Sequence, residues 1–127
     1  MPLFRIAFIK HGQGADKDFK MLVDVRTYTT KPGHVPLQLA LYERYALPVQ
    51  VRHLGQPLAF LIGETGNRNS MHHLWVYESA ADREEKRARM QADPEWREFL
   101  KRNVEGGHLL TQQTSLMVPA SFAPLGR

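Results

Sequence analysis

The chain of 127 residues contains no cysteine. This absence excludes disulfides, thiolate metal ligands and cysteine nucleophiles, and nothing in the sequence indicates an oxidising compartment. Long apolar runs are missing too, because the apolar stretch 3–9 is short and is interrupted by Arg5. We therefore expect neither a membrane-spanning helix nor a secretory signal. The length is that of one domain, and the expected location is cytoplasmic.

A concentration of one charge sign is also absent, although the net charge is +4. Between residues 82 and 102, seven basic side chains stand against six acidic ones. Several of them follow the acid-first i,i+4 order of an exposed helix: Asp82 with Lys86, Glu85 with Arg89, and Glu98 with Arg102. Recognition of phosphates would need one sign to dominate, so we expect no nucleic-acid partner.

The first 20 residues have neither helical nor strand periodicity, and Gly12 and Gly14 form no phosphate-loop signature. We interpret residues 1–20 as an N-terminal appendage to a domain that spans residues 21–127. Three alternatives stay open: a flexible arm, translation from a start upstream of a true start at Met21, and an extra edge strand over residues 3–9.

From residue 21 onward the pattern predicts strands and helices in alternation. Period-two alternation indicates strands over residues 21–29, 58–65, 71–77 and 108–118. Helical spacing indicates a helix over residues 34–46, a kink before Pro48 and a short helical piece closed by a left-handed cap at Gly55. Ser79 and Asp93 are expected to cap two charged helices, with Pro94 in the first turn of the second.

The order strand, helix, strand, strand, helix, strand is typical of the split βαβ, ferredoxin-like α+β fold. In this fold the first and third strands occupy the centre of an antiparallel sheet, and the helices cover one face. We expect the helices to cover the aliphatic face, which carries Val23, Val25, Leu74 and Val76. The opposite face would then carry a polar and aromatic set: Asp24, Arg26, Tyr28, His73, Trp75 and Tyr77.

A sheet this small cannot cover its second face with its own helices. We therefore predict a symmetric homodimer, packed sheet to sheet, that encloses a partly polar cavity between the two sheets. A small-molecule ligand in this cavity is the other candidate partner.

Four motifs occur in a recognisable order. They are DVRTYT at residues 24–29 followed by KPG at 31–33, HLWVYES at 73–79, DPEW at 93–96, and FAPL at 122–125. Over residues 21–125 the chain resembles the NIPSNAP family. The resemblance implies a dimeric α/β-barrel domain. It also implies kinship with small cytosolic bacterial proteins of no established reaction, and with eukaryotic relatives linked to mitochondria, vesicle traffic and mitophagy signalling.

The candidate ligand-binding residues are Asp24, Arg26, Tyr28, His73, Trp75 and Tyr77. In a functional interpretation Arg26 attracts an anionic or carbonyl-bearing ligand, His73 shuttles a proton near neutral pH, and the tyrosines donate hydrogen bonds. In a structural interpretation Asp24 and Arg26 neutralise each other, Trp75 covers the arginine, and the rings fill an interface. The sequence leaves both open.

Two function classes follow. One is a ligand-binding or interaction module, and the other is a cofactor-independent enzyme, monooxygenase-like or isomerase-like, with His73 and Arg26 as catalytic candidates. We expect no metal, because His72 and His73 are adjacent on a strand and point to opposite faces. No cofactor is implied, and haem held by His73 or His108 has only the analogy with haem-handling relatives of this fold behind it.

Overall fold

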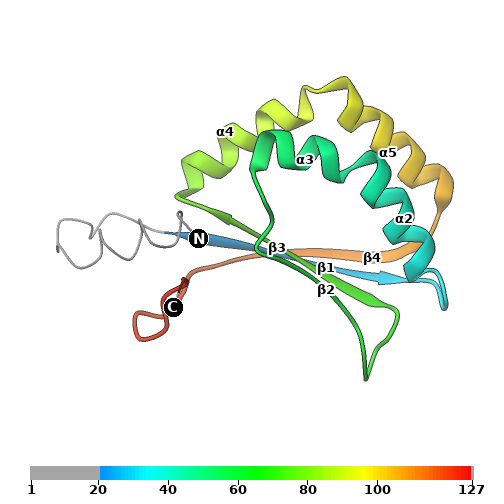
Figure 1. Ribbon diagram of the computed structural model, residues 1–127, viewed down its shortest axis with the longest axis horizontal. Helices are drawn as coiled ribbons and strands as arrows, with labels where there is room; N and C mark the ends of the chain where they lie inside the picture. Colours follow the sequence, from blue (N-terminus) through cyan, green and yellow to red (C-terminus); the bar gives the residue numbers. More distant parts are fainter. Residues whose placement is uncertain (1–20, 127) are drawn as a thin grey trace.

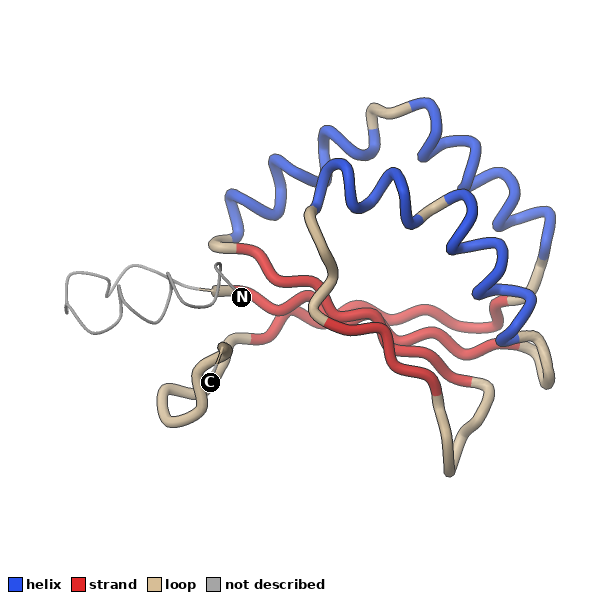
Figure 2. The backbone as a smooth tube through the Cα atoms, viewed as in Figure 1, coloured by secondary structure: helices blue, strands red, loops and turns tan. Residues whose placement is uncertain are grey.

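The computed structural model describes residues 21–126 (Figure 1). Along this part of the chain the elements are β1 (Leu22–Thr30), α2 (Val35–Tyr45), α3 (Leu47–Leu54), β2 (Ala59–Ile62), β3 (Ser70–Tyr77), α4 (Ala80–Gln91), α5 (Pro94–Gly106) and β4 (Leu109–Met117). The strands form one antiparallel sheet in the order β2-β3-β1-β4. The helices arch over one face of this sheet (Figure 2). The predicted ferredoxin-like fold, with the first and third strands in the centre, is confirmed.

The connections from β1 to β2 and from β3 to β4 are each a pair of short helices. A proline stands in the first turn of the second helix of each pair. Pro48 opens α3 and Pro94 opens α5. A proline has no N–H to donate, and the first turn of a helix is where none is required. Gly55 ends α3 with φ 83° and ψ −168°, so the expected left-handed cap at this position is wrong. The left-handed cap belongs to Gly107 at the end of α5, with φ 63° and ψ 29°.

The caps predicted for α4 and α5 are formed. Ser79 Oγ accepts from the backbone N–H of Asp82 at 3.0 Å, and the Asp82 carboxylate accepts from the N–H of Glu78 at 3.0 Å. Asp93 caps α5 by accepting from the N–H of Glu95 at 2.9 Å. The three acid-first pairs predicted on the exposed helix faces are also present.

The strand expected over residues 58–65 is shorter and ends at Ile62. The chain turns at Gly63, where an added Cβ would collide with the backbone carbonyl of Asn67. Only glycine tolerates such a close approach. The segment that follows is the connection to β3.

The core lies between the helices and the sheet, and it is rich in aromatic rings. Its buried members are Tyr42, Ala46, Val49, Leu54, Trp75, Tyr77, Met90, Trp96 and Phe99. Trp75 and Tyr77 are each 1% exposed. The helices therefore cover the face that carries the rings.

The sequence-based assignment of the two sheet faces is thus wrong. Asp24 and Arg26 of β1 lie under the helices with His73 and Trp75 of β3. The aliphatic set, Val23, Val25, Leu74 and Val76, takes the opposite face because neighbouring residues on a strand alternate in direction. Each buried aromatic side chain removes roughly 150–250 Å² from water, more than a valine does, so the aromatic face gains more from helix cover. Consequently the candidate site residues cannot line a cavity between two sheets.

Replacing the capping serine of α4 should destabilise the domain. Ser79→Ala removes the acceptor for the Asp82 N–H, and we expect the free energy of unfolding to fall by about 1 kcal/mol in urea titrations. Ser121→Ala is the control, because Ser121 is exposed and lies outside helices and strands. Equal stability of the two variants would contradict the capping role.

Candidate small-molecule site

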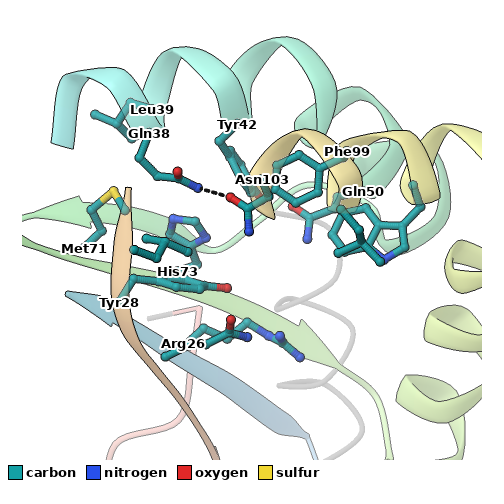
Figure 3. A pocket seen from close by; sticks show the side chains of 14 residues that line it. Arg26, Tyr28, Gln38, Leu39, Tyr42, Gln50, Met71, His73, Phe99 and Asn103 are labelled. Carbon is teal, nitrogen blue, oxygen red and sulfur yellow. Dashed lines mark hydrogen bonds between the residues drawn. The ribbon is translucent and has the colours of Figure 1, made fainter. Parts of the chain in front are cut away.

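A cavity of about 70 Å³ lies between the helices and the sheet (Figure 3). The sheet contributes Arg26, Tyr28, Met71 and His73. The helices contribute Gln38, Tyr42, Gln50, Trp96, Phe99 and Asn103, among others. One water molecule needs roughly 10–15 Å³ of such space, so the cavity has room for a small organic group.

The side of the cavity that faces solvent lies between α5 and β4. Leu100 of α5 and Gln112 of β4 line it and are exposed. Deep residues such as His73 and Phe99 are at most 5% exposed. The cavity therefore runs from the solvent side inward to the polar residues Arg26 and His73 of the sheet.

A buried ion cluster adjoins the cavity at Arg26. The Asp24 carboxylate has no exposed surface, and it accepts from Arg26 Nε at 3.1 Å and from Arg83 Nε at 2.9 Å. Burial by itself would lower the pKa of Arg26, but the Asp24 carboxylate and Tyr28 together outweigh this effect and raise the pKa above its ordinary value. The guanidinium of Arg26 therefore stays charged beside the cavity.

The neutralising pair expected in the structural interpretation is thus present, whereas the cation–π cover is not. Within residues 21–126, the guanidiniums that lie over an aromatic ring are those of Arg44 and Arg102, both over Tyr45. Trp75 instead packs against Phe60, with 5.7 Å between ring centroids. Its role is in the core.

His73 is held among aromatic rings. Its ring stacks on Phe60 with centroids 4.1 Å apart, and Tyr28 and Tyr42 each lie 4.8 Å away. Burial lowers the pKa of His73 to about 4, and the positive charge of Arg26 contributes to the decrease. The imidazole is therefore neutral at pH 7, which removes the charge change near neutral pH that a proton shuttle would use.

Four residues that line the cavity each bury a polar atom that has no hydrogen-bond partner within the described residues: Gln38 Oε1, Tyr42 OH, Gln50 Oε1 and His73 Nε2. The four residues are at most 6% exposed. Leaving such a buried group unpaired costs about 1–3 kcal/mol. Their convergence on one cavity is what a site for a polar ligand requires.

The orientation of Gln38 is fixed by a neighbouring helix. Its Nε2 donates to Asn103 Oδ1 at 2.8 Å, shown as the dashed line in Figure 3. This bond leaves the second atom of each amide, Gln38 Oε1 and Asn103 Nδ2, to other partners. Burial raises the pKa of Tyr42, so its hydroxyl stays protonated and able to donate.

The structure brings together only part of the set expected from the sequence. Arg26, Tyr28 and His73 line the cavity, whereas Asp24, Trp75 and Tyr77 do not. The sequence reasoning missed the helical half of the site. Its signal is a polar residue on an otherwise apolar stripe, since Gln38 and Tyr42 stand four residues apart on the buried face of α2.

Neither a metal nor haem fits this site. In the part of the chain that the structure describes, no group of three or more potential ligands is close enough for a metal ion. His72 and His73 point to opposite faces, as expected, because Thr27 Oγ1 and His72 Nδ1 lie 3.1 Å apart on the open face. A cavity of about 70 Å³ is far too small for a porphyrin beside His73, and His108 Nδ1 is 3.0 Å from His34 Nδ1.

None of the helices over residues 21–126 combines the length and apolar character needed to span a membrane.

The sheet topology and the helices on one face define an α+β, ferredoxin-like domain with the fold that dimeric α/β barrels share. A family model described as NIPSNAP matches residues 23–124, so the chain belongs to the NIPSNAP family. The resemblance stated from the sequence motifs is therefore confirmed.

One curated relative and three solved structures are similar to this chain. Protein NipSnap of Drosophila melanogaster is 25% identical over 122 residues, which make up 95% of this chain and 43% of that protein. The chain thus spans less than half the length of this curated relative. The crystal structure of a NIPSNAP family protein with unknown function from Agrobacterium tumefaciens is 35% identical with a TM-score of 0.75, over 84% of this chain and 94% of that one.

An uncharacterised NIPSNAP-like domain protein from Burkholderia xenovorans is 31% identical with a TM-score of 0.75, over 83% of this chain and 90% of that one. A protein from Chloroflexus aurantiacus, thought to be an antibiotic biosynthesis monooxygenase, is 12% identical with a TM-score of 0.54, over 84% of this chain and 99% of that one. The last similarity concerns the fold alone.

The neutral state of His73 predicts a pH dependence of stability. Its folded pKa of about 4 lies below the ordinary histidine value of 6.5, so acid protonates the unfolded state first. This contribution to stability is complete above the unfolded pKa and is lost as the pH falls toward the folded pKa. We expect a loss of roughly 2–3 kcal/mol between pH 7 and pH 4.5, which His73→Phe should largely abolish.

Chemical denaturation at both pH values measures this effect. Phe60→Leu is the matched control, because it perturbs packing on the same ring but keeps the histidine. Parallel pH profiles for the wild type and His73→Phe would show that His73 carries no such penalty.

Proposed function

We propose that this NIPSNAP protein binds a small polar molecule in the cavity between the helices and the sheet of each protomer. The observation that carries the proposal is the convergence of four unpartnered, buried polar atoms, from Gln38, Tyr42, Gln50 and His73, on one cavity. A purely structural core would place apolar atoms there or pair these groups with one another. A ligand that pairs them recovers the cost of their burial.

The polar lining defines the chemistry of the ligand. The carbonyl oxygens of Gln38 and Gln50 accept hydrogen bonds, so the ligand must supply N–H or O–H groups on the helix side. Arg26 on the sheet side favours a ligand oxygen such as a carbonyl. The rings of Tyr28, Tyr42 and Phe99 line the remaining wall and favour a flat molecule.

A cofactor-independent enzyme is the second candidate, because His73 Nε2 and Arg26 line the same cavity. Such an enzyme would use His73 as a base and Arg26 to stabilise the resulting anion. A histidine with a pKa of about 4 is a weak base at neutral pH. We therefore favour ligand binding over catalysis as the function of this cavity.

We further propose a homodimer packed sheet to sheet, but through the aliphatic face rather than the polar one. Val25 and Leu74 are paired at the centre of that face, and Ala59 of β2 lies beside Leu74. β4 is exposed along nearly its whole length. A second copy would cover both features, and the ligand cavities would then lie within the protomers. A cytoplasmic location and the absence of nucleic-acid binding remain predictions from the sequence.

Replacing Gln50 by leucine separates a binding site from a structural core. Gln50→Leu keeps the volume but removes the unpartnered oxygen, so the ligand-free protein should gain about 1 kcal/mol of stability. Small molecules released by denaturing the purified protein, identified by mass spectrometry, should be lost from this variant. Gln56→Leu is the matched control at an exposed position and should retain them. A wild-type extract no different from that of Gln50→Leu would refute ligand binding in the cavity.

A charge on the aliphatic face should disrupt the dimer. Leu74→Asp buries an unpaired carboxylate in the proposed interface, and we expect light scattering to give a monomeric mass. Val104→Asp is the control, because Val104 is 81% exposed on α5. Circular dichroism verifies that both variants are folded. A Leu74→Asp protein that stays dimeric would place the interface elsewhere.

A further inference from the structure

Positive charge exceeds negative charge in the ion cluster around Asp24. Asp24 is the partner of both Arg26 and Arg83. Arg87 lies one turn after Arg83 on α4 and is half-buried. Within residues 21–126, no carboxylate forms an ion pair with Arg87. Arg26 and Arg83 therefore share one carboxylate, and Arg87 stands one helical turn away without a carboxylate partner.

The environment of Arg87 reflects this excess. Burial lowers the pKa of Arg87, and the positive charges of Arg26 and Arg83 lower it further. The exposed arginine on the same helix, Arg89, is instead paired with Glu85 at 2.7 Å. Arg87 thus carries a partly desolvated charge without the counter-charge that its neighbour has.

The hydroxyl of Tyr77 adds a buried donor to the cluster. Tyr77 is 1% exposed, and its hydroxyl has no hydrogen-bond partner among the described residues. Burial and the charge of Asp24 raise the pKa of Tyr77. The positive charges of Arg87, Arg26 and Arg83 lower it by less, so the hydroxyl keeps its proton. None of Tyr77, Arg83 and Arg87 lines the cavity described above.

We propose that Arg83, Arg87 and the Tyr77 hydroxyl form a phosphate-binding site that adjoins the ligand cavity at Arg26, the one residue of this group that lines the cavity. One carboxylate against three guanidiniums leaves two positive charges, which a dianionic phosphate neutralises and a carboxylate does not. Guanidiniums bind phosphate oxygens through paired, charge-assisted hydrogen bonds. The buried Tyr77 hydroxyl supplies one more donor.

Isothermal titration of the full chain with inorganic phosphate at low ionic strength tests the site. Saturable binding should weaken by about tenfold or more in Arg87→Gln, as expected for the loss of one charge-assisted contact. Arg89→Gln is the matched control and should bind as the wild type does, because Arg89 is paired on the solvent side of the helix. Titration with acetate should give much weaker binding than phosphate, and titration with phenyl phosphate tells whether an ester or the free ion is preferred.

Tyr77→Phe provides a second variant that keeps the aromatic ring in the core. It should reduce phosphate affinity by about threefold to tenfold without lowering the thermal midpoint in phosphate-free buffer. The proposal is overturned if wild-type protein shows no saturable phosphate binding, if acetate binds as tightly, or if Arg87→Gln and Arg89→Gln lose affinity equally. Because Arg87 and Tyr77 do not line the cavity, such a failure would leave the proposed cavity binding intact.

Discussion

The carboxylate of Asp24 is the group on which the polar side of this domain depends. It has no exposed surface, and it neutralises Arg26 and supports Arg83. Two guanidiniums held there without it would lose their hydration uncompensated, a cost of several kcal/mol per ion. Because side chains alternate along a strand, an Asp24 that lies under the helices brings Arg26 to the same face. The pairing of β1 with β3 then places His73 opposite Arg26.

A cavity between helices and sheet that is lined by buried polar groups is costly for stability. Two glutamines, a tyrosine and a histidine bury atoms without partners in the cavity, although an apolar replacement of similar volume would pack as well. Proteins retain such groups where binding needs them, and stability is given up for function. Moving the site inside the protomer also leaves the aliphatic face of the sheet available for a second copy. The proposed binding and the proposed dimer therefore use opposite faces of one sheet.

The strand order, the proline-marked helix breaks and the serine and aspartate caps could be read from the sequence, because each depends on local chemistry. The orientation of the sheet could not. Both faces of β3 carry buried-type side chains, with Leu74 and Val76 on one and Trp75 and Tyr77 on the other, so alternation alone does not say which face the helices cover. Half of the site was missed for a related reason. Gln38 and Gln50 reach the cavity only through the way two short helices fold over the sheet, a tertiary arrangement that helical periodicity does not encode.

The central claim is that each protomer holds its own ligand between helices and sheet, and the number of ligands per dimer tests it most directly. Native mass spectrometry of the purified protein, compared with the mass after denaturation, counts them. We expect a dimer that carries two copies of the same small molecule when saturated, one in each cavity. A dimer that saturates with a single copy would place the ligand between the two sheets, and would contradict binding within each protomer.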